Sequence, residues 1–137
     1  MTDLEFRRRI IAAWGLDEDK FKDFDLGLVA VATAAPSGYP RKVAMSPYIP
    51  VVGGHTYTYD GGWDTTQESQ NILAIALYNT NKVYVNYFGL NMNGSRTSTI
   101  SSAYSYVRLT VNMDNLANAY ILDNTTGEYV FRGSDYI

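Results

Sequence analysis

Short apolar and β-branched runs recur from Leu26 to the C-terminus, and turn-forming residues separate them at near-regular spacing. Gly, Pro, Asn and Asp gather at residues 36–40, 53–54, 61–62, 79–81 and 123–127. The runs between these turns are long enough for strands but too short for ordinary helices, and about eight or nine of them can be counted. The pattern predicts an all-β fold, specifically an antiparallel β-sandwich.

The N-terminus carries a helical pattern instead. Thr2 and Glu5 have the spacing of a capping box, and Gly15 can end the helix. We therefore expect a short N-terminal α-helix with a linker at 1–22, followed by the β-sandwich domain at 23–137.

The predicted helix has an apolar stripe that needs a partner, because so short a helix is marginally stable alone in water. Two partners fit the pattern: the chain's own sandwich, or a neighbouring subunit. On the second interpretation the helix is a docking or oligomerisation segment, which would use Phe6, Arg7, Arg8, Ile10 and Trp14.

Composition excludes several classes of function. The chain of 137 residues has a net charge of -3, and its basic residues cluster only at Arg7 to Arg9, so we expect no nucleic-acid partner. It has no cysteine, which excludes disulfides and thiolate chemistry. No apolar stretch reaches the ~18 residues of a membrane helix, and no signal-peptide pattern opens the chain, so we expect no membrane association.

Alternation along the strands predicts which side chains share a face. In the run 103–112, Val107, Leu109 and Val111 form the predicted core side. The other side of this run carries tyrosines and an arginine, and one side of the predicted strand 82–88 carries aromatic and polar residues. Together these two sides give a candidate binding surface, which consists of Tyr84, Asn86, Phe88, Tyr104, Tyr106 and Arg108. The alternative is an ordinary outer sheet face whose Tyr and Thr residues pair across strands.

Trp63 stands in a Gly-rich loop and has two interpretations. Its ring can stack on the apolar face of a sugar, or it can anchor the loop in the end of the sandwich. On the first interpretation the ligand-binding residues are Trp63, Tyr84, Asn86, Tyr106 and Arg108.

The sequence offers little for catalysis. His55 is the only histidine, and no Gly-x-Ser-x-Gly segment accompanies it. Asp60, Asp64 and Glu68 lie in or beside a polar loop that we interpret as solvated, although hard oxygen ligands of this kind can also hold Ca²⁺. We therefore predict no enzymatic activity and no required cofactor, with Ca²⁺ as the one ion to consider.

Three segments, in order, resemble a known family. Residues 48–58 read Tyr-Ile-Pro-Val, a Gly turn and then Thr-Tyr-Thr; residues 76–84 read as a strand, an Asn-Thr-Asn-Lys turn and the next strand; residues 103–111 read Ala-Tyr-Ser-Tyr-Val-Arg-Leu-Thr-Val. Together they are similar to the carbohydrate-binding-module-like jelly rolls of phage tail, fibre and other virion proteins, and of some bacterial surface proteins. The resemblance covers most of 26–137 and omits the N-terminal helix.

The resemblance implies a jelly-roll sandwich displayed on a virion or another extracellular surface. It also implies a phage structural protein that adheres to host-surface glycans and docks, through its helix, on other virion proteins or sister subunits as a homo-oligomer. Two alternatives stay open: a purely structural capsid or baseplate decoration protein without a ligand, and a bacterial surface glycan-binding domain.

Overall fold

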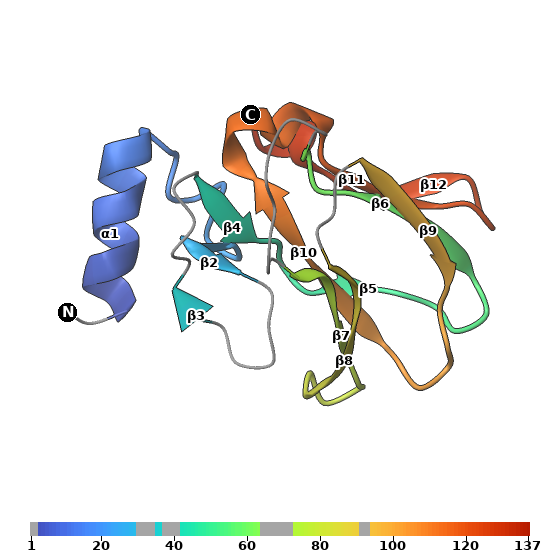
Figure 1. Cartoon of the computed structure of the whole chain (residues 1–137). Helices are drawn as coiled ribbons and strands as arrows, with labels where there is room; N and C mark the ends of the chain where they lie inside the picture. Colours follow the sequence, from blue (N-terminus) through green and yellow to red (C-terminus); the bar gives the residue numbers. More distant parts are fainter. Residues whose placement is uncertain (1–2, 30–34, 37–41, 64–72, 91–93) are drawn as a thin grey trace.

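The computed structural model describes residues 3–29, 35–36, 42–63, 73–90 and 94–137. Within these ranges the strands form two main antiparallel sheets and a small ribbon, with one α-helix at the side (Figure 1). The all-β expectation with a short N-terminal helix is confirmed. The finer jelly-roll connectivity stays a prediction.

The larger sheet contains six of the described strands. Its order is β1 (Asp25–Leu26), β4 (Val43–Met45), β10 (Tyr106–Asn112), β7 (Leu73–Tyr78) and β8 (Tyr84–Leu90), and β5 (Ile49–Pro50) also pairs with β10. The central strand is thus β10, whose first part pairs with both β5 and β7 and whose last part pairs with β4.

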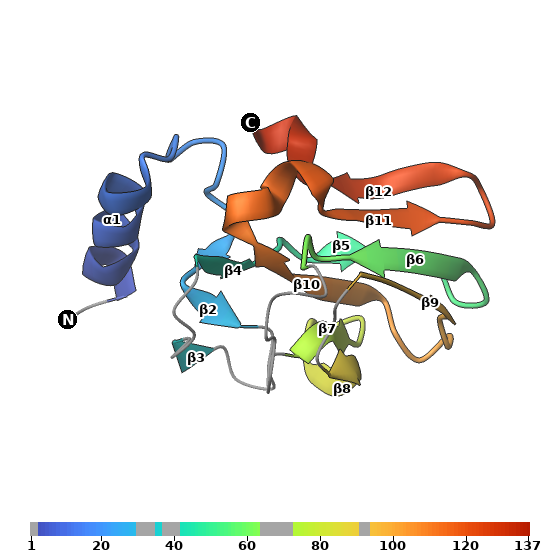
Figure 2. The same ribbon diagram turned by 45° about the horizontal axis from the view of Figure 1, so that its top comes forward.

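The smaller sheet has the order β12 (Glu128–Arg132), β11 (Tyr120–Asp123), β6 (Thr56–Asp60) and β9 (Ser95–Thr99). Its strands β12, β11 and β6 run side by side above β10 in Figure 2. Two short strands, β2 (Leu28–Val29) and β3 (Ala35–Pro36), form a separate ribbon. Two 3-10 helices, η1 (Met113–Asn118) and η2 (Gly133–Tyr136), lie near the C-terminus.

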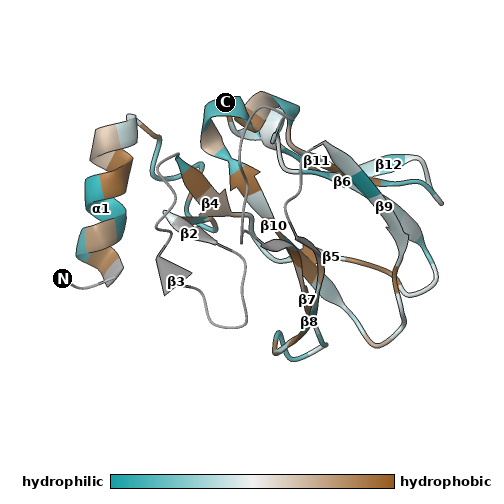
Figure 3. Ribbon diagram, in the orientation of Figure 1, coloured by the Kyte–Doolittle hydropathy of each residue, from teal (hydrophilic) through white to brown (hydrophobic). Residues whose placement is uncertain are grey.

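The main core lies between the two sheets. As predicted, Val107, Leu109 and Val111 are fully buried on one side of β10. They share a cluster with residues of the smaller sheet, namely Tyr57, Tyr59, Ile121 and Phe131. In Figure 3, β4, β7 and part of β10 have the brown colour of hydrophobic residues, in agreement with the central position of these strands.

The other side of β10 is also buried, which alternation does not predict. Arg108 is 4% exposed and Thr110 is fully buried. The reason is that Met45 on β4 and Ala76 on β7 flank this side and join a second cluster with several tyrosines. Both faces of the central strand are therefore covered from Val107 to Asn112.

The helix α1 (Asp3–Trp14) packs on the protein's own sandwich, which is one of the two partners considered above. Ile10 and Trp14 contact the main core, and Arg7 donates hydrogen bonds to the carbonyl oxygens of Phe21 and Phe24. Both of these phenylalanines are buried, so the core begins at Phe21, two residues before the predicted domain start. Arg8 is exposed. In the described part of the chain, no helix has the length and apolarity needed to span a membrane.

Candidate functional site

A row of three tyrosines crosses the larger sheet on its outer side. Tyr106 on β10 pairs with Tyr78 on β7, and Tyr78 pairs with Tyr84 on β8. Tyr48, just before β5, packs against the row and completes it. We call these four residues, Tyr48, Tyr78, Tyr84 and Tyr106, the tyrosine face.

The rings of the tyrosine face meet edge to face. The centroid distances are 6.1 Å between Tyr84 and Tyr78, 4.9 Å between Tyr78 and Tyr48, and 6.2 Å between Tyr48 and Tyr106, with interplanar angles of 81°, 76° and 83°. Such perpendicular contacts stabilise aromatic pairs beyond their buried area. Tyr78 is buried, whereas the other three are half-buried and keep part of each ring at the surface. The face is therefore rigid and partly open to solvent.

Arg108 lies beneath this face as a buried cation. Its Nε donates to the carbonyl oxygen of Ser46 at 2.7 Å, and its Nη2 lies 2.7 Å from Oδ2 of Asp25. Its guanidinium carbon is 4.5 Å from the Tyr48 ring centroid. Because a buried charge needs such partners, Arg108 acts as an internal support that fixes Tyr48.

Lys82 brings a second cation to the face from the β7–β8 turn. Its Nζ lies 5.2 Å from the Tyr48 ring centroid and 5.3 Å from that of Tyr106. Lys82 has a φ of 59°, the left-handed region, where a residue with a Cβ costs roughly 1–2 kcal/mol. Among the described residues it is the only one other than glycine with positive φ.

The turn itself is tightly built. The side chain of Asn79 accepts hydrogen bonds from the amides of Asn81 and Val83, and the Lys82 amide donates to the Asn79 carbonyl at 2.9 Å. The hydroxyls of Thr80 and Ser105 lie 3.0 Å apart, so the turn is tied to the start of β10. These bonds fix the backbone from which Lys82 reaches the rings.

Burial keeps the hydroxyls of Tyr78 and Tyr84 protonated at neutral pH, because it raises the pKa of both. Burial raises the pKa of Tyr78 to about 12, against the opposing effect of Arg108. Burial also raises the pKa of Tyr84. Neutral phenols can donate and accept hydrogen bonds, but they are poor nucleophiles and bases, so the face is suited to binding.

The structure keeps three of the five predicted ligand-binding residues together and separates two. Tyr84, Tyr106 and Arg108 belong to the cluster just described. Asn86 pairs with Leu77, a core residue, because a bulge between Leu77 and Tyr78 shifts the register of β8. Asn86 thus lies on the other side of the strand from Tyr84, where its Nδ2 is 3.5 Å from the Tyr104 hydroxyl.

Trp63 is 3% exposed, and its Nε1 donates to the Thr110 carbonyl at 3.2 Å. A ring that is so buried cannot stack on a sugar, so we exclude Trp63 from the candidate binding surface. The geometry corresponds to the alternative interpretation, a loop anchor. The absence of a side chain at Gly61 makes room for the buried Trp63 ring. A Cβ at this position would lie 2.9 Å from Cδ1 of Trp63 and 2.4 Å from the Thr110 carbonyl oxygen, which is too close.

Most of the predicted docking residues contact the protein's own sandwich, and one of them is exposed. Phe6 and Ile10 face Gly27, where an added Cβ would lie 2.9 Å and 2.5 Å from their outermost ring and methyl carbons. Arg7 and Trp14 contact the sandwich as described above. Arg8 alone of the five is exposed, together with its neighbour Arg9.

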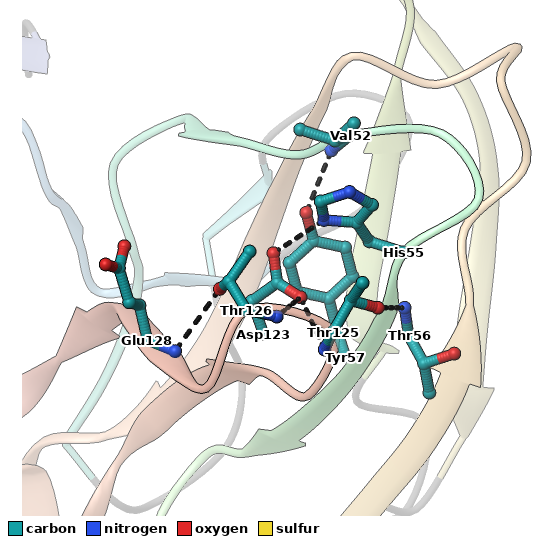
Figure 4. Close-up of polar contacts among 8 residues, drawn as sticks. All are labelled: Val52, His55, Thr56, Tyr57, Asp123, Thr125, Thr126 and Glu128. Atoms are coloured by element: carbon teal, nitrogen blue, oxygen red, sulfur yellow. Dashed lines mark hydrogen bonds and ion pairs between the residues drawn. The ribbon is translucent and has the colours of Figure 1, made fainter.

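His55 is part of a separate polar network where β11 ends and β6 begins (Figure 4). Its Nδ1 lies 2.8 Å from Oδ2 of Asp123, whose Oδ1 accepts the amides of Thr125 and Thr126. Burial raises the pKa of Asp123, but His55 and the two amides outweigh it and hold this pKa below its ordinary value. The network fastens the β11–β12 turn to the start of β6, so it has a structural explanation.

For Ca²⁺, only one of the three acidic residues considered is within the described residues. The Asp60 carboxylate accepts a hydrogen bond from the Gly62 amide at 2.8 Å. Burial raises the pKa of Asp60, and this effect outweighs the opposing effect of that hydrogen bond. Asp64 and Glu68 lie outside the described residues. Within the ranges described, no three His or acidic side chains gather where they could hold a metal ion.

No protein-family model matches this chain, and no curated protein or solved structure is significantly similar to it. The function is therefore inferred from the residues and the geometry of the site.

Three residues of the site, Tyr48, Tyr78 and Lys82, were missed by sequence reasoning. Tyr78 lies on the parity opposite to Leu73, Ile75 and Leu77, so the same alternation that assigned those residues to the core could have found it. In the structure Tyr48 lies before β5 and Lys82 lies in the β7–β8 turn. Alternation along 82–88 gives Lys82 the same parity as Tyr84, but it gives no indication that the Lys82 ammonium reaches the Tyr48 and Tyr106 rings.

Proposed function

We propose that this chain is a non-enzymatic binding module of a virion surface, and that its tyrosine face adheres to host glycans. The observation that carries the proposal is the cross-strand row of Tyr106, Tyr78 and Tyr84 with Tyr48 packed beside it. The sequence resemblance to carbohydrate-binding-module-like phage domains supports the same proposal independently of this geometry.

The tyrosine face has the chemistry that sugars need. A pyranose ring has an apolar C–H face and a polar rim, and a tyrosine has an apolar ring and a polar hydroxyl. Tyr also loses little conformational entropy on binding, and here the perpendicular contacts have already fixed the rings. The neutral hydroxyls of Tyr78 and Tyr84 favour hydrogen bonding over catalysis.

A single site of this size binds weakly, so we expect useful affinity only when several copies are displayed together. The test is therefore a glycan array probed with the protein held as a multivalent streptavidin complex. We expect bound glycans for the wild type and loss of binding for Tyr84→Ala and Tyr106→Ala, with folding checked by circular dichroism.

Tyr129→Ala is the matched control. Tyr129 is 51% exposed on β12, in the smaller sheet, so its removal takes away a tyrosine ring that is more exposed than Tyr84 or Tyr106 but lies on another surface. If no glycan binds, or if the three variants bind alike, the adhesion proposal fails. The purely structural decoration protein would then be the better hypothesis.

We further propose that the exposed side of α1 docks the module onto other virion proteins or onto sister subunits of a homo-oligomer. Its apolar side is already occupied, which leaves Arg8, Arg9 and the 52% exposed Leu4 for a partner. Deleting the helix would expose the core, so the double variant Arg8→Glu/Arg9→Glu is the sharper test. We expect a lower mass in light scattering or lower incorporation into particles, and Lys20→Glu/Lys22→Glu, on the exposed linker, serves as control.

The bacterial surface glycan-binding domain is the alternative that shares this site. It predicts the same array result, so the tyrosine variants do not separate it from the virion protein. Detection of the chain in purified particles would favour the virion, and detection on intact cells would favour the bacterial surface.

A further inference from the structure

Lys82 has an unusual combination of position, backbone and charge. It is exposed at the tip of the β7–β8 turn, it adopts the left-handed conformation, and its ammonium lies over two rings of the tyrosine face. Glycine would take this backbone without strain. Strain of this kind persists where the surrounding structure holds it in place, and it is found most often at functional sites.

The charge balance of the face shows what Lys82 contributes. The charge of Arg108 is compensated by Asp25 at 2.7 Å. Among the described residues, Lys82 has no carboxylate within ion-pair distance, and its ammonium lies over the Tyr48 and Tyr106 rings. The face therefore carries one uncompensated positive charge at its solvent-exposed edge.

We infer that the tyrosine face takes an acidic saccharide, with the sugar ring against the tyrosines and its carboxylate paired with Lys82. This inference rests on the proposed function and specifies its ligand. A cation held only by aromatic rings keeps most of its capacity to bind an anion, because an ammonium has three donors and the rings accept none of them in a directed bond.

A carboxylated sugar matches both parts of the face at once. Its C–H face can replace the ammonium on the Tyr106 ring as the ammonium turns to the carboxylate, and the half-buried Tyr84 and Tyr48 border the same spot. A charge-assisted bond at this edge should make the acidic sugar bind about tenfold more tightly than its neutral counterpart at low salt. A long polyanion is disfavoured, since the whole chain has a net charge of -3.

The test compares lactose with sialyllactose, which adds one carboxylated sugar residue to the same neutral disaccharide, by titration calorimetry or NMR shift perturbation. We expect sialyllactose to bind about tenfold more tightly, with the advantage lost as salt rises. Lys82→Gln and Lys82→Gly should reduce sialyllactose to the lactose level, and Lys82→Arg should keep most of the preference. Lys22→Gln, an exposed lysine of the linker, is the control for a change in overall charge.

Lys82→Gly separates a binding role from a structural role. Because glycine relieves the backbone strain, this variant should unfold at an equal or higher urea concentration than the wild type while it loses the acidic preference. A variant that loses the preference only because it is destabilised would contradict the inference.

The remaining outcomes divide the two proposals. Equal binding of lactose and sialyllactose, with no effect of Lys82→Gly, would overturn the role of Lys82 and leave glycan adhesion intact. Absence of binding to every glycan of the array would overturn adhesion itself. Tighter binding of a single-stranded oligonucleotide or of inorganic phosphate than of sialyllactose would show that the face recognises anions without recognising sugars, and would also overturn the inference.

Discussion

Asp25 and Arg108 form an ion pair across an intervening strand. Asp25 is on β1, Arg108 is on β10, and β4 lies between them, yet Oδ2 and Nη2 are 2.7 Å apart. The two ends differ in burial: the Arg108 side chain is 5% exposed, whereas that of Asp25 is 43% exposed. The pair therefore connects a buried cation under the tyrosine face to a carboxylate that solvent can reach.

This asymmetry predicts the effect of removing the acid. Asp25→Asn leaves a buried guanidinium without its counter-ion, so we expect the free energy of unfolding to fall by about 1–3 kcal/mol. The matched control is Asp135→Asn, because Asp135 and Arg132 are 3.5 Å apart and both more than half exposed. Loss of that surface pair should change stability by less than about 0.5 kcal/mol in urea denaturation. Equal changes in the two variants would mean that Arg108 does not depend on Asp25.

The glycines allow steric and conformational costs to be separated. A Cβ at Gly133 would lie 1.9 Å from the carbonyl oxygen of Leu116, which is backbone and cannot easily move. We expect Gly133→Ala to cost about 3 kcal/mol or more. At Gly127, with φ of 78° and no atom within 4 Å of the added carbon, we expect Gly127→Ala to cost only about 1–2 kcal/mol from backbone strain. Thermal denaturation of both variants measures the difference, and the opposite order would contradict the packing of η2 on η1.

The core side of the central strand was predictable because it depends on one simple rule. Val107, Leu109 and Val111 alternate with polar residues, and a strand with one apolar side turns that side to the core. The fate of Arg108 on the other side was not predictable in this way. Alternation assigns a residue to a face, but whether the face is covered depends on neighbours such as Met45 that pair with the strand from far away in the sequence.

The error at Asn86 has a local cause. Strict alternation places Tyr84 and Asn86 on one face, but the bulge pairs Tyr78 with Tyr84 and Leu77 with Asn86. One extra residue in β8 is enough to change the face of all that follow. Trp63 shows a different limit, since a Gly-rich loop gives no indication of whether its aromatic residue points outward or is buried.

The arginines of α1 form a natural pair of test sites. Arg7 donates to two backbone carbonyls of the 21–24 segment, whereas Arg8 is exposed. We expect Arg7→Met to lower the free energy of unfolding by about 1–3 kcal/mol, because hydrogen bonds to a charged donor are lost and two carbonyls lose a partner. Arg8→Met should stay within about 0.5 kcal/mol. If both variants were neutral, the helix would not be held to the sandwich by Arg7.

The His55–Asp123 network predicts a specific dependence of stability on pH. Burial raises the pKa of Asp123, but the partners of the carboxylate outweigh this and hold the pKa below the ordinary value of 3.8. The unfolded chain therefore binds the proton more readily than the folded one. Asp123 contributes stability above pH 3.8, and that contribution is lost as the pH falls from there through the lower pKa of the folded state.

Asp123→Asn tests this directly by urea denaturation between neutral and acidic pH. We expect the variant to be less stable than the wild type at neutral pH, since the interaction of the carboxylate with His55 is removed and the bonds from the Thr125 and Thr126 amides become weaker. The gap should narrow as the pH falls below 3.8, because the wild type then also loses its carboxylate. Glu128→Gln, an exposed residue at the end of the same turn, should show no such convergence. A gap that stays constant across this range would show that the charge on Asp123 does not stabilise the turn.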